Sequence, residues 1–134
     1  MTEYLKIYGV AFAAFITIDL IWLVFIANSL YKKYLGFIMR PSPNWIAALI
    51  FYIIFMAGLV FFVIHPAIEK GNWKFALLAG MFFGLITYAT YDLTNLATLK
   101  DWPAIITVID LVWGTTLGGL VSLVTFWIVK VINN

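Results

Sequence analysis

The stretch Trp45–His65, WIAALIFYIIFMAGLVFFVIH, decides the fold of this chain. Nearly all of its residues are apolar, and it contains no Asp, Glu, Lys or Arg. A helix needs about 20 mainly apolar residues to cross the hydrocarbon core of a bilayer. This stretch is therefore predicted to be a membrane-spanning helix.

Three further runs of the same kind lie on either side of it, at about residues 4–30, 75–98 and 103–132. Polar breaks separate the four runs, at Tyr31–Asn44, Pro66–Lys74 and Leu99–Trp102. No series of short segments alternates between apolar and polar residues, as a membrane β-barrel requires. The prediction is an all-α, polytopic integral membrane protein, a four-transmembrane-helix bundle that forms a single transmembrane domain over residues 1–134.

The composition excludes most other classes of protein. Hydrophobic residues make up 65% of the 134 and charged residues 10%, and the mean hydropathy is +1.05. A soluble domain carries roughly 25% charged residues, and a disordered chain combines low hydrophobicity with high charge. A net charge of +2 is too small for a nucleic-acid-binding surface. The absence of cysteine excludes disulfides and thiolate chemistry.

The breaks between the runs predict how the helices end. The third break is so short that the last two spans must be antiparallel neighbours. Asp101 is predicted to cap the N-terminus of the last helix, with Pro103 in its first turn. His65 and Pro66 are predicted to end the second span. Five aromatic residues lie where the membrane interfaces belong: Trp45, Trp73, Trp102, Tyr4 and Tyr31.

The charges at the ends of the spans are evenly divided between the two sides. The first and third breaks share one side and hold Lys32, Lys33, Arg40 and Lys100, whereas the other side holds Lys6, Lys70, Lys74 and Lys130. Basic residues accumulate in cytoplasmic loops. The cluster of three in the first break favours placing that side in the cytoplasm and both termini outside.

Three aspartates, Asp19, Asp92 and Asp110, lie inside the predicted spans. Ionisable residues at membrane depth are costly, so they are candidates for function. Counted from one side of the membrane at about 1.5 Å per residue, all three lie in the same half of the bilayer or near its middle. We expect their carboxyl groups to converge on one polar cluster.

The third span carries a polar stripe that includes one of these acids. Its small and polar residues follow helical spacing, at Gly84, Thr87, Tyr88, Tyr91, Asp92 and Asn95. Thr107, Asp110 and Gly114 share a face of the fourth span, and Tyr52 lies at matching depth in the second. The candidate residues for binding a ligand or a proton are Asp19, Asp92, Asp110, Tyr52, Tyr88, Tyr91, Asn95, Trp22 and Trp113.

No Lys or Arg lies within the spans to neutralise the three acids. An isolated carboxylate is costly in apolar surroundings. This leaves three states open: protonated acids that donate hydrogen bonds, acids that hold a cation, and acids that face a wet cavity. Polar groups also join membrane helices without any other role. The acids are therefore either a functional site or contacts between helices.

A short motif occurs in the first span and again in the last. Residues 18–22, IDLIW, match residues 109–113, IDLVW, and residues 91–93, YDL, repeat part of it. The first and last spans run in opposite directions, so the motif suggests an inverted repeat of the kind found in transporters. Trp22 and Trp113 either shield the acids, give a cation an aromatic wall or fill the bundle.

Small residues recur at every fourth position in the last two spans, at Ala76, Gly80 and Gly84, and at Gly114, Gly118 and Ser122. Such series allow helices to approach closely, within one subunit or between subunits. Four helices enclose little space. A transport pathway is therefore expected to need a homodimer, with one of these series at the contact.

Six stretches carry a resemblance to known proteins: residues 18–23 (IDLIWL), 31–36 (YKKYLG), 43–45 (PNW), 89–99 (ATYDLTNLATL), 102–103 (WP) and 110–115 (DLVWGT). They resemble a family of small bacterial membrane proteins, the domain of unknown function 2177. The resemblance extends over nearly the whole chain. It implies a bacterial inner-membrane protein and no particular activity, because the family has none assigned.

These features favour a proton- or cation-coupled carrier of a small ligand. The alternative is a non-enzymatic structural or accessory protein whose aspartates only hold helices together. An enzyme is not expected, because the sequence has neither convergent basic residues nor closely spaced aspartates on one helix. No cofactor is predicted, and a metal is left open. The expected partners are the lipid bilayer, a second copy of the chain and a small ligand or cation, with no nucleic acid.

Overall fold

The computed structural model describes residues 2–134 of the chain. It contains four continuous helical rods that are long and apolar enough to cross a membrane: Thr2–Leu35, Trp45–Lys70, Trp73–Thr98 and Ala104–Asn133. No strand occurs among these described residues. The predicted all-α bundle of four spans is confirmed.

A short π-helix interrupts each of the first two rods. The first rod consists of α1 (Thr2–Trp22), the π-helix η1 (Leu23–Ala27) and α2 (Asn28–Leu35). The second consists of α3 (Trp45–Leu59), the π-helix η2 (Val60–Ile64) and α4 (His65–Lys70). The third and fourth rods are α5 (Trp73–Thr98) and α6 (Ala104–Asn133).

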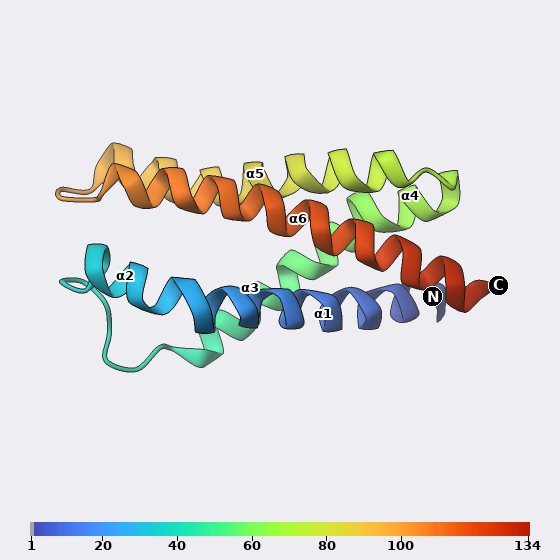
Figure 1. Cartoon of the computed structure of the whole chain (residues 1–134), viewed down its shortest axis with the longest axis horizontal. Coiled ribbons are helices and arrows are strands. Elements are labelled where there is room, and N and C mark those ends of the chain that lie inside the picture. The colour runs from blue at the N-terminus through green and yellow to red at the C-terminus, as the bar shows by residue number, and fades with distance from the viewer. Residues whose placement is uncertain (1) are drawn as a thin grey trace.

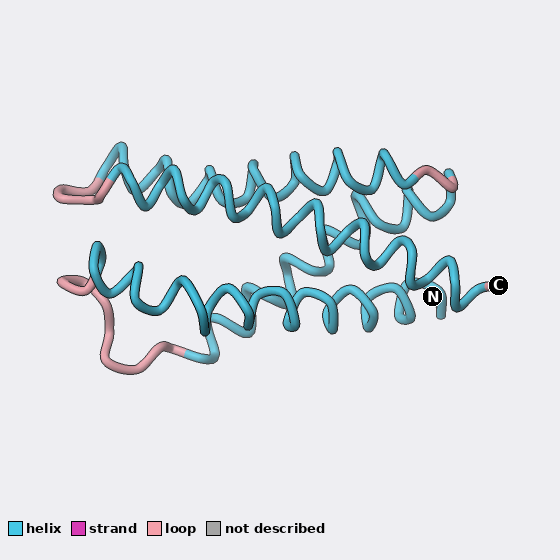
Figure 2. Tube along the Cα trace, in the orientation of Figure 1, coloured by secondary structure: helices cyan, strands magenta, loops and turns pink. Residues whose placement is uncertain are grey.

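The four rods form an elongated bundle with two distinct ends. In Figure 1, α5 and α6 lie side by side along their length, and α6 crosses α1 where the two chain termini lie. Figure 2 shows the loops at residues 36–44 and 99–103 together at the opposite end. We call these the terminal end and the loop end. The first and third breaks share one end, as predicted.

The apolar core occupies the half of the bundle at the terminal end. Its α1 residues recur at every fourth position, at Ile7, Ala11 and Phe15, and so form one buried stripe. The stripe packs against buried residues of the second rod and of α6: Phe55, Met56, Leu59, Val60, Val63, Ile64, Leu117, Val121 and Val129. The apolar side chains of this half are packed together as in the core of a soluble protein.

The small-residue series join α5 to α6 within the subunit. A Cβ added at Gly80 would lie 2.5 Å from the carbonyl oxygen of Gly118, and one added at Gly84 would lie 2.0 Å from that of Gly114. Ser122 is also buried in this contact. The expectation that one of these series forms a dimer contact was therefore wrong, because α5 and α6 already use both.

The first two rods are longer than predicted. The first continues to Leu35, so Tyr31 is helical and does not lie in a loop. The second passes Pro66 and ends at Lys70, where Gly71 takes a left-handed conformation with φ of 64°. Proline lacks the N–H that a helix interior needs, and the wider turn of η2, which ends at Ile64, accommodates this.

His65, predicted at the end of the second span, lies at the terminal end and far along the bundle from the acids. Its ring stacks on Tyr4 with a centroid distance of 4.1 Å. Its Nδ1 lies 3.0 Å from a carboxylate oxygen of Glu69. Both of these contacts are with residues near the end of a rod.

The starts of the last two rods differ slightly from the predicted ones. The α5 helix begins at Trp73, and the side chain of Asn72 caps it by accepting a hydrogen bond from the N–H of Phe75 at 3.1 Å. The prediction that Asp101 caps α6 was wrong. Asp101 has φ of 61° and forms the tight turn itself, a conformation that aspartate tolerates. The capping position belongs to Pro103.

Candidate functional site

The three aspartates lie beyond the apolar core, toward the loop end. Asp19 occupies the next position of the buried α1 stripe after Phe15, and Asp92 and Asp110 come from α5 and α6. Asp92 is fully buried, and Asp19 and Asp110 are nearly so. The three acids thus lie on the inner faces of three different rods.

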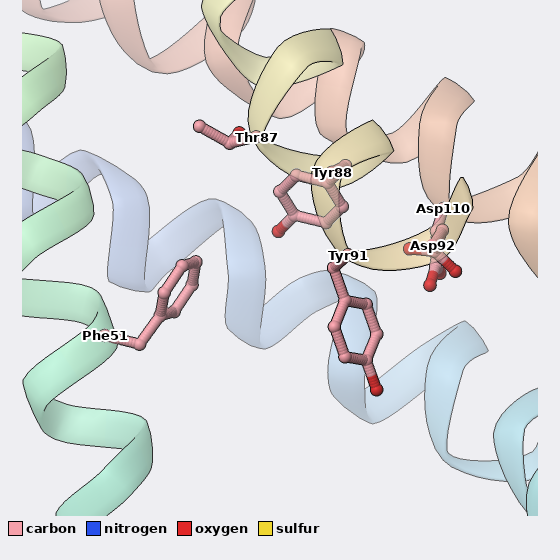
Figure 3. Close-up of a pocket in the computed structure, with 6 residues that line it drawn as sticks. All are labelled: Phe51, Thr87, Tyr88, Tyr91, Asp92 and Asp110. Carbon is pink, nitrogen blue, oxygen red and sulfur yellow. The ribbon is translucent and has the colours of Figure 1, made fainter. Parts of the chain in front are cut away.

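Asp92 and Asp110 form a pair in the wall of a cavity of about 310 Å³. Their carboxyl groups lie side by side (Figure 3), one from each helix of the α5–α6 hairpin. Two negative charges that lie side by side in apolar surroundings repel each other strongly. The pair is therefore stable with a shared proton or with a bound cation. The rest of the lining is Phe51, Thr87, Tyr88 and Tyr91.

Tyr31 holds Asp110 in place. Its hydroxyl donates a hydrogen bond to a carboxyl oxygen of Asp110, from α2 to α6. Tyr31 was predicted to lie at the membrane interface, so this contact corrects that assignment. A hydroxyl that donates to Asp110 leaves the accepting oxygen without a proton. Of the two acids, Asp110 is thus the one with a fixed partner.

The π-helix η1 brings Tyr31 onto the inner face of the first rod. In an uninterrupted α-helix, the 12 residues from Asp19 to Tyr31 would turn the second side chain about 120° away from the first. A π-turn holds about one residue more than an α-turn. With η1 in between, Tyr31 returns to within about 20° of the direction of Asp19.

Asp92 has no such partner. No N–H or hydroxyl in the described part of the chain donates a hydrogen bond to its carboxyl group, whose one polar neighbour is the carboxyl group of Asp110. Only its backbone is fixed: the hydroxyl of Thr107 lies 3.3 Å from the Asp92 carbonyl oxygen, and the indole N–H of Trp102 donates to that hydroxyl at 3.0 Å. The helix is anchored at this point, while the carboxyl group itself is held only by its contact with Asp110.

Asp19 lines a second, adjoining cavity of about 220 Å³. Its carboxyl group interacts with the side chains of Trp113 and Tyr52. The two cavities share a wall that Phe51 and Tyr88 form. No three acidic or histidine side chains in residues 2–134 lie close enough to hold one metal ion. The predicted single cluster is therefore a pair plus a separate acid.

Tyr88 reaches this shared wall because α6 has a glycine opposite it. A Cβ added at Gly114 would lie 2.3 Å from the ring of Tyr88. Since Gly114 has no side chain, Tyr88 packs directly against the α6 backbone. Tyr88 of the predicted polar stripe on α5 and Gly114 on α6 thus form one contact between the two helices.

The two copies of the repeated motif meet in the bundle. The rings of Trp22 and Trp113 stack with centroids 4.4 Å apart and planes inclined by 8°. Trp113 also interacts with Asp19, and Trp22 with the hydroxyl of Tyr31. Each tryptophan therefore connects its own copy of the motif to the acid region of the other copy.

Tyr91 and Asn95 lie at the edge of the site. Tyr91 lines the larger cavity, but its side chain is 60% exposed and its ring packs edge-on against Trp102 at 5.9 Å. Asn95 is half-buried, neighbours Tyr91 and lines neither of the two cavities. Tyr52 lines the cavity of Asp19, as its depth had suggested.

Sequence reasoning missed four residues of the site: Leu23, Tyr31, Ala48 and Phe51. Phe51 directly precedes Tyr52, and its ring serves both cavities. The sequence gives no signal for Tyr31, because its position depends on the π-helix. An aromatic residue next to a selected tyrosine was a weak signal for Phe51.

A family model of predicted membrane proteins, the domain of unknown function 2177, matches residues 4–127. Among curated proteins none matches the chain, and none matches among solved structures. The match extends over all four helical rods and includes the three aspartates and both tryptophans of the repeated motif. The chain, a membrane protein that crosses the bilayer several times, belongs to the domain of unknown function 2177 family.

Proposed function

We propose that the chain is a carrier that couples the movement of a small ligand to a proton or another cation. The observation that carries this proposal is the carboxyl group of Asp92, which is fully buried, receives no hydrogen bond from an N–H or hydroxyl of the described residues, and lines a cavity beside Asp110. A buried polar group without a partner costs about 1–3 kcal/mol. A group kept at that cost is typical of a site that binds something.

The charge distribution supports the same proposal. Every basic residue lies near a helix end or in a loop, so no lysine or arginine reaches the level of the acids. Acids at membrane depth without a basic partner are typical of proton relays and cation pathways. The position of Asp92 beside Asp110 makes this pair the coupling site, with Asp19 as a second site across the shared wall.

An accessory protein without transport activity is the second candidate. The hydrogen bond from Tyr31 to Asp110 favours it, because this bond joins two helices in the way that polar groups do in membranes. A role in joining helices would not explain why the carboxyl group of Asp92 is buried without a donor. Under either function the chain is not an enzyme, and we place it in the inner membrane of a bacterium, with the loop end in the cytoplasm.

A carrier of this size is proposed to work as a homodimer, because the two cavities beside the acids are small. With the glycine series buried, the second copy must contact another face of the subunit. Many large apolar side chains remain on the outside, for example Phe25, Ile46 and Phe62. The mass of the protein in mild detergent tests this point, and a monomer alone would favour the accessory function.

The coupling proposal is tested by measuring the thermal stability of the purified protein between roughly pH 5 and pH 8. The wild type should lose stability as the pH rises, because ionisation of Asp92 places a second negative charge beside Asp110 without a counterion. The variant Asp92→Asn keeps the shape of the side chain but cannot ionise. Its stability should not depend on pH in this range.

Asp101→Asn is the matched control, because Asp101 lies in an exposed turn and asparagine tolerates the same left-handed conformation. This variant should retain the full pH response. If the wild type and Asp92→Asn respond identically, and the same holds for Asp19→Asn and Asp110→Asn, proton coupling is refuted.

A further inference from the structure

The larger cavity combines an acid pair with aromatic rings. The rings of Phe51, Tyr88 and Tyr91 line it together with Asp92 and Asp110, as Figure 3 shows. They come from α3 and α5, and in Figure 3 Tyr88 and Tyr91 lie between Phe51 and the carboxyl groups. The face of an aromatic ring attracts cations within about 6 Å of its centre. The cavity is thus suited to positive charge from two sides.

The two acids have different roles toward a bound ligand. The oxygen of Asp110 that faces Tyr31 is occupied by the tyrosine hydroxyl. Among the described residues, no N–H or hydroxyl donates a hydrogen bond to either oxygen of Asp92. Asp92 is therefore the group of the pair that can exchange a proton for a cation. An anionic ligand would meet two acids and no basic residue.

The lining favours an organic cation over a bare metal ion. No three acidic or histidine side chains in the described residues are close enough to coordinate one. Ca²⁺ takes six to eight oxygen ligands, and Mg²⁺ requires an octahedral shell. Aromatic rings provide neither. They do provide apolar contact for the alkyl groups of an organic cation.

The size of the cavity limits the ligand further. Ligand pockets for drug-sized molecules have volumes of about 300–1,000 Å³, and this cavity of about 310 Å³ is at the lower limit. The ligand is therefore a small molecule.

We propose that this cavity binds a small alkylammonium ion, with the carboxylate of Asp92 as its counterion and the rings of Phe51, Tyr88 and Tyr91 around its alkyl groups. The cation enters as the carboxyl group of Asp92 releases its proton to water, so the charge of the site is conserved. This inference rests on the proposed carrier function and names its class of ligand.

The probe is choline, and its neutral control is 3,3-dimethylbutan-1-ol, in which a carbon atom replaces the nitrogen. Added to the purified full-length protein in weak buffer near neutral pH, choline should raise the melting temperature and release protons, which a pH-indicator dye detects. The neutral alcohol has the same shape and should do neither. Equal binding of the alcohol would overturn the proposal, because the site would then recognise shape alone.

Two variants test the two sides of the site. Asp92→Asn should abolish both the choline shift and the proton release. Tyr91→Leu removes one ring at a position that is 60% exposed, so it should fold normally and weaken choline binding about 3- to 30-fold. Asp101→Asn should bind choline as the wild type does. Choline binding that survives both Asp92→Asn and Tyr91→Leu would overturn the proposal by placing the ligand elsewhere.

The result also separates this inference from the carrier proposal. If the wild type shows the pH response of Asp92 but choline neither binds nor releases protons, the alkylammonium inference fails and proton coupling stands. If the pH response is absent as well, both fail.

Discussion

The half of the bundle at the terminal end and the half at the loop end are built from different interactions. At the terminal end, apolar side chains from α1, η2 and α6 are fully buried against one another. At the loop end, the buried side chains include three aspartates and Thr107, and two cavities adjoin them. One half is a packed apolar core, and the other half contains cavities that polar and aromatic side chains line.

The difference shows how a short chain can keep a fold and a site in one bundle. Close packing of apolar and small residues stabilises the helices where nothing has to bind. The buried carboxyl groups, the most costly polar groups in the bundle, lie in the other half. The buried α1 stripe changes from Ile7, Ala11 and Phe15 to Asp19 within one helix, so the boundary between the halves lies between Phe15 and Asp19.

The largest effect is expected from a methyl group added to the packed half. Gly80→Ala should lower the free energy of unfolding by about 1–3 kcal/mol, because its Cβ would lie 2.5 Å from the Gly118 carbonyl oxygen and the Ser122 hydroxyl. Thermal unfolding in detergent measures this change.

The matched control is Gly9→Ala, where an added Cβ meets nothing within 4 Å. Alanine favours a helix over glycine by about 0.5–1 kcal/mol, so this variant should be as stable as the wild type or more so. Equal losses in both variants would show that α5 and α6 are not in the close contact described here.

A smaller effect should separate the two acids of the pair. Asp110→Leu should lower stability by about 0.6–2 kcal/mol, because it leaves the Tyr31 hydroxyl without its acceptor. Asp92→Leu should keep or raise stability, since it removes a buried polar group to which no N–H or hydroxyl of the described residues donates. The two melting temperatures in detergent provide the comparison. A loss in Asp92→Leu as large as that in Asp110→Leu would favour the accessory function.

The smallest effect is expected from the hydroxyl of Tyr31. Tyr31→Phe should cost about 0.6 kcal/mol, the average for a hydrogen bond between membrane helices. Tyr34→Phe makes the same change on the same helix and should cost less. In the background of Asp110→Asn, the cost of Tyr31→Phe should decrease if the two residues interact. Strictly additive losses in that double mutant would argue against the contact.

The sequence predicted the four spans because length and apolar composition decide them directly. It placed their ends less well, because a residue such as Pro66 stops a regular helix but not one that passes through a π-turn. Asp101 looked like a helix cap, yet its left-handed backbone makes it part of the turn. These errors come from local backbone geometry that the hydrophobic pattern does not contain.

The site was predicted only in part, and local backbone geometry is again the reason. Depth along a helix can be counted, so the sequence predicts the acids in one half of the bundle. Direction around a helix depends on regular turns, and η1 shifts it for every residue that follows, including Tyr31. The separation of Asp19 from the pair depends on the shared wall at Tyr88, which only the packing of that ring against Gly114 reveals.

The stacked tryptophans give the molecule an optical signal of its own. Trp22 and Trp113 are the one pair of stacked indoles among the described residues, with centroids 4.4 Å apart and nearly parallel planes. Indoles this close couple their electronic transitions and produce an exciton band in circular dichroism. One ring belongs to the first rod and the other to α6, so any motion that separates these helices at the cavities weakens the band. Opening of the site can therefore be followed in the unlabelled protein.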